Sequence, residues 1–211
     1  MEGYITVKER AVGEYEEKRS RFIATICPVS SEEEAVAFIK EQKQKYFDAR
    51  HNVYVWVLAS GECRFSDDGE PHGTAAKPML DIINGRKLKN VCMVITRYFG
   101  GVLLGTGGLV RAYGEAAKDC IKNSTVVQMG VLSLYSVKAD YVQYNRLLPF
   151  LESFNAQVTD TVFEDSVTVK FSLDSLKEES LNEKLTDAFF GRLKAEKTGE
   201  TLSIVNILNI F

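Results

Sequence analysis

A glycine-rich turn between an apolar segment and an amphipathic segment constrains this chain more than any other feature. Five glycines fall within nine residues: Gly100, Gly101, Gly105, Gly107 and Gly108. They follow an apolar run at 91–98, which predicts a buried strand, and precede helical apolar spacing at 109–122. A glycine turn that opens a helix exposes backbone N–H groups beside the positive end of the helix dipole. The sequence therefore favours an anion site here, and close contact between helix and sheet is the structural alternative.

Basic and aromatic residues surround this turn. Residues 77–122 hold eight basic and three acidic side chains, a net charge of +5. Arginines that alternate with Phe and Tyr rings are typical of proteins that bind RNA. We expect Arg97, at the end of the strand, and Arg111, one turn into the helix, to form a phosphate-sized positive site with the glycines. Lys77 and Lys87 are expected to assist them.

A second motif, at 64–75, is acidic and lies between a predicted strand and a predicted helix. Its carboxylates suit magnesium or calcium, so one interpretation is a loop that binds a cation or orients a base. Asp, Gly and Pro are also turn formers, and Thr caps helices, so the other interpretation is a structural turn. In a third interpretation, Arg97 or Arg111 pairs with an acidic residue of this loop and so joins the two motifs. The candidate residues of the loop are Arg64, Asp67, Asp68, Glu70 and Thr74.

The hydrophobic patterns predict an α+β protein with two domains, 1–130 and 131–211. In the first half we expect an antiparallel pair of strands with Gly13 at the turn, and a helix at 75–84 that ends at Gly85. Its other elements are a helix that begins at 30–34, strands at 51–59, 63–65 and 91–98, and a helix at 109–122. The second half reads β-α-β-β-α-β, the order of the ferredoxin-like fold. Its elements are expected at 131–139, 141–153, 156–163, 166–173, 176–190 and 202–210.

Charge and apolar content exclude several classes of protein. The net charge is −3, which excludes a polybasic nucleic-acid binder by bulk charge. The longest apolar run, 53–59, is far shorter than the roughly 20 residues that span a membrane. The four cysteines lie about thirty residues apart, so we expect free thiols, no metal site and a cytoplasmic protein. No nucleophile–base pair can be identified, so the catalytic residues stay unknown and no cofactor is predicted.

The motifs at 64–71, 73–75, 96–101 and 104–113 resemble the YigZ/IMPACT family, as a bacterial two-domain member. The resemblance implies an N-terminal domain like the second domain of a small-subunit ribosomal protein and like domain IV of elongation factor G. In that fold a mixed sheet carries helices on one face. The C-terminal domain is expected to resemble domain V of elongation factor G.

The same resemblance implies a role in translation. It predicts a regulatory protein that contacts RNA, the ribosome or a translation-regulatory protein through the basic glycine-rich surface. Two alternatives stay open: a nucleotide- or phosphate-binding enzyme that uses the glycine loop with an Asp/Glu metal site, and a pure protein–protein regulator. Membrane binding is not expected, and the sequence does not indicate an oligomeric state.

Overall fold

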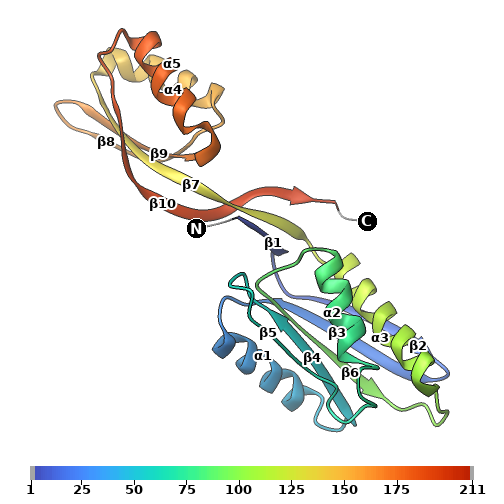
Figure 1. Ribbon diagram of the computed structural model, residues 1–211. Helices are drawn as coiled ribbons and strands as arrows, with labels where there is room; N and C mark the ends of the chain where they lie inside the picture. The colour runs from blue at the N-terminus through green and yellow to red at the C-terminus, as the bar shows by residue number, and fades with distance from the viewer. Residues whose placement is uncertain (1–2, 210–211) are drawn as a thin grey trace. The chain divides into compact units, whose positions relative to one another are not determined.

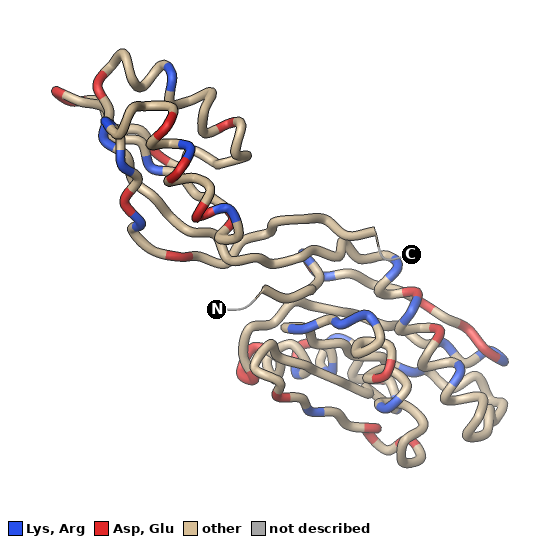
Figure 2. The backbone as a smooth tube through the Cα atoms, turned by 45° about the horizontal axis from the view of Figure 1, so that its top comes forward, with Lys and Arg blue, Asp and Glu red and all other residues tan. Residues whose placement is uncertain are grey.

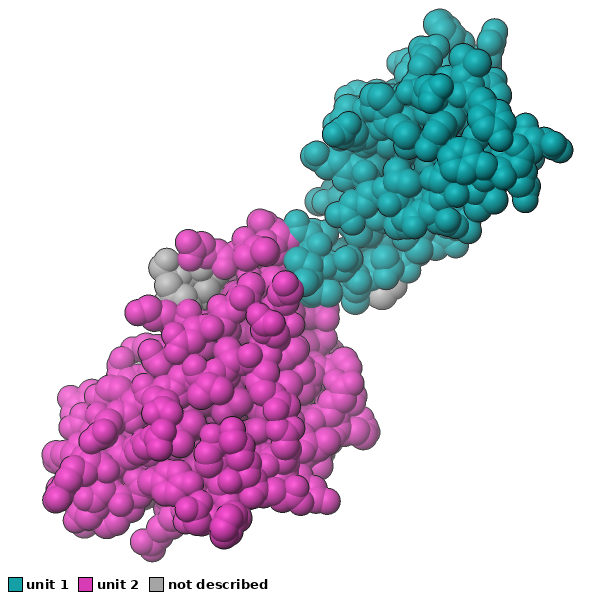
Figure 3. Space-filling view, turned by 180° about the vertical axis from the view of Figure 1, so that it is seen from behind, with its two compact units in different colours: residues 1–3, 129–205 teal, residues 4–128, 206–211 magenta. Residues whose placement is uncertain are grey.

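The computed structural model describes residues 3–209, which divide into two compact units. Tyr4–Gln128 with residues 206–209 form one unit, here named the N-unit, and Gly3 with Met129–Val205 form the other, the C-unit (Figure 3). Both combine helices with strands, so the predicted two-domain α+β class is confirmed. The division falls just before Met129, inside a strand. The domain limits 1–130 and 131–211 stay a prediction.

A five-stranded antiparallel sheet forms the centre of the N-unit (Figure 1). Its order is β2-β3-β6-β4-β5. The strands are β2 (Ala11–Glu17), β3 (Ser20–Pro28), β4 (His51–Val57), β5 (Cys63–Ser66) and β6 (Val91–Tyr98). The predicted mixed sheet is therefore wrong, because every neighbouring pair in this sheet runs antiparallel.

Helices cover both faces of this sheet (Figure 1), which also corrects the expectation that they share one face. Helices α2 (Ala76–Gly85) and α3 (Gly105–Lys122) pack on one face, where Phe22 and Tyr113 are buried. Helix α1 (Glu32–Lys45) packs on the other, in a smaller core that includes Phe38, Trp56 and Val94. The reason is that β6 is buried from Val91 to Arg97, so both faces of the central strand need cover.

The turn between β2 and β3 lies at Lys18 and Arg19, not at the predicted Gly13. Both residues have positive φ, 48° and 65°, as a two-residue hairpin turn requires. Gly13 instead lies inside β2 opposite Ala24. A Cβ atom there would lie 2.3 Å from the backbone nitrogen of Cys120. Gly13 therefore permits the close approach of α3 to the sheet.

Two helix ends differ from the sequence prediction. Helix α3 begins at Gly105 instead of residue 109, so three of the motif glycines belong to its first turn. Helix α2 includes Gly85 as its last residue, and Arg86 is the C-cap. The start of α1 agrees with its capping motif, because the Ser31 side chain accepts a hydrogen bond from the Glu34 N–H group.

The C-unit has the predicted β-α-β-β-α-β order of elements. They are β7 (Val126–Ala139), α4 (Tyr141–Ser153), β8 (Gln157–Phe163), β9 (Val167–Asp174), α5 (Glu178–Phe189), preceded by the 3₁₀ turn η1 (Ser175–Lys177), and β10 (Ala195–Leu208). In its sheet β7, β9 and β8 lie in that order, and β10 also pairs with β7; β1 (Tyr4–Val7), a strand of the N-unit, pairs with β7 as well. The last strand begins earlier than predicted, and the predicted end at 210 lies outside the described residues. The likeness to elongation factor G stays a prediction.

The close approach at Gly13 yields a stability prediction. Gly13→Ala should lower the free energy of unfolding by about 2–3 kcal/mol, because the new methyl group forces α3 away from β2. The matched control is Gly85→Ala, whose Cβ would meet no atom within 4 Å. In urea denaturation, the free energy of unfolding of Gly85→Ala should lie within about 0.5 kcal/mol of that of the parent protein, or above it. Equal stability of the two variants would contradict the proposed close contact.

Candidate functional site

The glycine turn after β6 is fixed by its backbone. The Gly100 N–H group donates to the Ser20 hydroxyl at 3.1 Å, and a Cβ atom at Gly100 would lie 2.1 Å from the Arg19 carbonyl carbon. Gly101 and Gly105 have φ of +84° and +72°, a region that favours glycine. Gly100 therefore permits a close approach to the turn between β2 and β3, which is not the predicted contact between helix and sheet, and Gly101 and Gly105 supply the positive φ of the turn.

The first turn of α3 carries the N–H groups that sequence analysis assigned to an anion site. No side chain caps this helix, because its N-cap is Leu104. Gly107 has open space around it, and a Cβ atom at Gly108 would meet only the Leu104 Cβ, at 3.0 Å. The first backbone N–H groups of a helix have no partner within it and lie at the positive end of its dipole. This helix start can therefore receive an anion.

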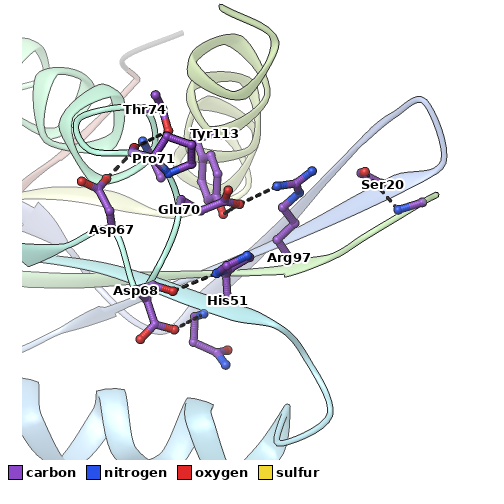
Figure 4. Close-up of polar contacts among 12 residues, drawn as sticks. Ser20, His51, Asp67, Asp68, Glu70, Pro71, Thr74, Arg97 and Tyr113 are labelled. Carbon is purple, nitrogen blue, oxygen red and sulfur yellow. Dashed lines mark hydrogen bonds and ion pairs between the residues drawn. The ribbon is translucent and has the colours of Figure 1, made fainter. Parts of the chain in front are cut away.

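A buried ion pair lies behind the helix start. The Glu70 carboxylate accepts a hydrogen bond from Arg97 Nη1 at 2.7 Å and another, on the same oxygen, from the Tyr113 hydroxyl at 2.8 Å (Figure 4). The side chains of Arg97 and Glu70 are only 7% and 3% exposed. Burial, and then the adjacent Glu70 charge, raise the pKa of Tyr113, so its phenol keeps its proton as a donor. Three segments meet here: the acidic loop, β6 and α3.

The position of Arg97 corrects its predicted role as an open phosphate contact. Its ion pair with Glu70 agrees with the alternative interpretation, in which an arginine pairs with the acidic loop. Its guanidinium also lies 5.4 Å from the centre of the Phe22 ring and 5.8 Å from that of Phe99. Its buried Nε has no hydrogen-bond partner among the described residues. A buried donor without a partner is uncommon and costly.

The first acid of the loop serves as a helix cap. Asp67 accepts hydrogen bonds from the N–H groups of Gly73, Ala75 and Ala76, at 2.8, 3.2 and 2.8 Å. A carboxylate at this place satisfies the free donors of α2 and suits its dipole. Thr74, the predicted cap, does not cap the helix; its hydroxyl donates to the Pro71 carbonyl at 2.6 Å.

The other members of the acidic loop contact different neighbours. Asp68 accepts a hydrogen bond from the Asn52 N–H group at 2.7 Å and pairs with Lys43 at 2.8 Å. Arg64 forms a surface ion pair with Glu32 at 2.6 Å. Among the described residues, no three His, Cys, Asp or Glu side chains form a group that could hold a metal ion. These contacts support the structural interpretation of the loop.

A pocket of about 340 Å³ opens at the start of α3. Its charged and polar lining comes from Arg50, His51, Glu70 and Arg97, with Gly105 and Thr106 of the helix. Its apolar lining comes from Pro71, Phe99, Leu103, Leu104 and Leu109. Arg50 is exposed and has no ion-pair partner among the described residues. The pocket thus combines a free cation, an uncapped helix start and apolar walls.

The remaining predicted cations lie outside this pocket. Lys77 and Arg111 line a separate hollow between α2 and α3, beside Asp81 and Glu115. Lys87 follows the end of α2 and lines neither hollow. Lys and Arg residues of the N-unit are interspersed with Asp and Glu (Figure 2). The four predicted cations Arg97, Arg111, Lys77 and Lys87 therefore do not form one cluster.

Two pocket residues were not identified as functional from the sequence. Arg50 lies in no motif, and only its position directly before β4 could have drawn attention to it. His51, a lone histidine at the start of a predicted strand, is assigned no function by the sequence, and its Nδ1 lies 2.8 Å from the Asp68 carbonyl oxygen. Because a carbonyl only accepts, Nδ1 carries the proton, and Nε2 is an acceptor when the ring is neutral. His51 thus has a structural contact and a free acceptor.

Comparison with known proteins assigns the chain to a family. The Impact N-terminal domain matches residues 18–121, and a domain of unknown function (DUF1949) matches residues 137–192. IMPACT family member YvyE of Bacillus subtilis (strain 168) is 32% identical over 211 residues, which cover 99% of this chain and 97% of that protein. The chain belongs to the IMPACT family. The family resemblance inferred from the two motifs is confirmed.

Other family members extend the comparison. IMPACT family member YigZ of Escherichia coli (strain K12) is 34% identical over 181 residues, which cover 84% of this chain and 89% of that protein. Protein IMPACT of Mus musculus is 30% identical over 94 residues, 42% of this chain and 30% of that protein. A crystal structure of a hypothetical protein has a TM-score of 0.60 and 31% identity, and covers 93% of this chain and 98% of its own. No helix in the described part of the chain is long and apolar enough to cross a membrane.

The buried pair yields a prediction on stability. Arg97→Met should lower the free energy of unfolding by about 3–5 kcal/mol, because it leaves the Glu70 charge buried without its partner. The double variant Arg97→Met with Glu70→Gln should recover part of that loss. A double-mutant cycle from urea denaturation should give a coupling energy above about 1 kcal/mol. Losses that simply add would contradict a direct interaction between the two side chains.

Proposed function

We propose that this IMPACT family member is a translation-associated binding protein that holds a phosphate group of RNA in the pocket at the start of α3. Membership of the family supports a role in translation, which the motif resemblance implies. The site supports a phosphate, because positive potential from the helix start and from Arg50 converges on one small hollow.

The carrying observation is that an unpaired cation and an uncapped helix start line the same pocket. Arg50 lines it and has no ion-pair partner among the described residues. The uncapped first turn of α3 adds backbone N–H groups. Glu70 neutralises Arg97, so the net positive charge comes from Arg50 and the helix start. One phosphate group would satisfy these donors together.

A metal-dependent enzyme receives less support from the geometry. The Asp67 and Asp68 carboxylates accept backbone hydrogen bonds, and Glu70 is held by Arg97 and Tyr113. All three acids therefore have structural partners. His51 lines the pocket, and its Nδ1 is held by the Asp68 carbonyl oxygen.

The cations outside the pocket have a supporting role in this proposal. Arg111 and Lys77 in the hollow between α2 and α3, and Lys87 beyond α2, add longer-range attraction for a polyanion. Their contribution should be smaller than that of Arg50, because acidic side chains lie beside two of them. Lys77 pairs with Asp81 at 3.6 Å, and Glu115 lines the same hollow as Arg111.

Arg50→Gln is the test of this function. It should lower the affinity for a single-stranded RNA oligonucleotide roughly tenfold, because it removes one charged phosphate contact. It should also reduce the slope of log K against log salt by about 0.7–1. Fluorescence anisotropy at several salt concentrations measures both quantities.

The control for net charge is Arg192→Gln, which changes another exposed arginine, in the C-unit. It should leave both the affinity and the salt slope close to those of the parent protein. Arg111→Gln should give a loss smaller than that of Arg50→Gln. If the parent protein binds no RNA, or if all three variants lose affinity equally, the pocket is not an RNA phosphate site.

A further inference from the structure

The apolar part of the pocket has no role in binding a phosphate alone. Phe99 is 47% exposed and Leu103 82%; both lie on the short segment between β6 and α3 and line the pocket. Large apolar side chains that gather at the mouth of a pocket indicate that an apolar ligand surface is buried there. The ligand of this pocket should therefore carry an apolar group close to its anionic group.

The Phe99 ring is held in place before any ligand binds. Arg97 lies 5.8 Å from its centre, within cation–π range, and Arg97 is itself fixed by Glu70. The next residue, Gly100, is anchored to Ser20 by its N–H group. A ring that is ordered on one side by a buried cation and nearly half exposed on the other is a preformed stacking platform. Such a platform costs little conformational entropy on binding.

Size and chemistry together point to one unstacked nucleotide. The pocket volume of about 340 Å³ lies at the lower end of the range for small-molecule sites, roughly 300–1,000 Å³. Nucleobases stack on aromatic side chains with little regard to sequence. In a duplex the bases are already stacked inside the helix and unavailable, whereas single strands and loops can present them.

From these observations, and resting on the proposed function, we infer that the pocket selects single-stranded over duplex RNA. One base stacks on Phe99 with Leu103 beside it, while the adjacent phosphate binds at the start of α3. The selection then comes from the apolar platform, and the electrostatic attraction comes from Arg50 and the helix start. Removal of the ring should abolish the preference and leave the phosphate contact in place.

Phe99→Leu is the decisive variant, because it keeps an apolar side chain and removes the aromatic face. Binding should be measured by anisotropy with a single-stranded RNA oligonucleotide and with the same sequence as a duplex. The parent protein should prefer the single strand. Phe99→Leu should lose about tenfold or more in affinity for the single strand and little for the duplex. Phe65→Leu is the matched control, since Phe65 is 49% exposed, lies in the same unit and does not line the pocket.

The outcomes separate this inference from the proposed function. If Arg50→Gln weakens binding but Phe99→Leu equals the parent protein, the stacking inference is wrong and the phosphate site stands. Equal binding of single-stranded and duplex RNA by the parent protein would also overturn the inference. If the parent protein binds neither RNA, both proposals fail. Phe99→Trp keeps an aromatic face and should retain the preference for single-stranded RNA. That result would show that the loss in Phe99→Leu is due to removal of the ring.

Discussion

The ion pair between Glu70 and Arg97 is the interaction on which the site depends. It joins the acidic loop to the central strand β6, and Tyr113 extends it to α3. A buried ion pair gives little net stability compared with apolar residues of the same volume. Its effect is geometric, because neither charge can be left buried alone. The pair therefore fixes the loop, the strand end and the helix in one arrangement around the pocket.

This arrangement explains why the two sequence motifs occur together. The motif at 64–75 supplies Glu70 to the pocket and Asp67 to the start of α2. The motif at 96–113 supplies Arg97, the glycine turn and Tyr113. Glu70 of the first motif thus binds Arg97 and Tyr113 of the second. The charged side chains of Asp67, Asp68, Glu70 and Arg97 all have partners within the protein. Arg50, outside both motifs, lines the pocket, is exposed and has no ion-pair partner among the described residues.

The sequence was sufficient for the features that depend on local pattern. The α+β class, the order of elements in the C-unit, the limits of β6 and α4 and the family all followed from periodicity and motif content. The errors arose where a residue acts across the chain. Gly13 looks like a turn former, but it permits close contact with Cys120 of α3, which is more than a hundred residues away in the sequence. Arg97 looks like a surface cation, and its burial depends on Glu70 and on helices that cover both faces of β6. Arg50 lies in no motif, and its position directly before β4 is a weak local signal.

Phosphate binding at the first turn of α3 can be measured by a nitrogen-15 NMR titration of the whole chain with inorganic phosphate. We expect the amide signals of Thr106, Gly107 and Gly108 to shift and saturate, while those at the start of α2, which Asp67 already caps, stay in place. Chloride at equal ionic strength should give no saturable shift. Shifts of similar size at both helix starts, or none at the start of α3, would show that α3 has no phosphate site of its own.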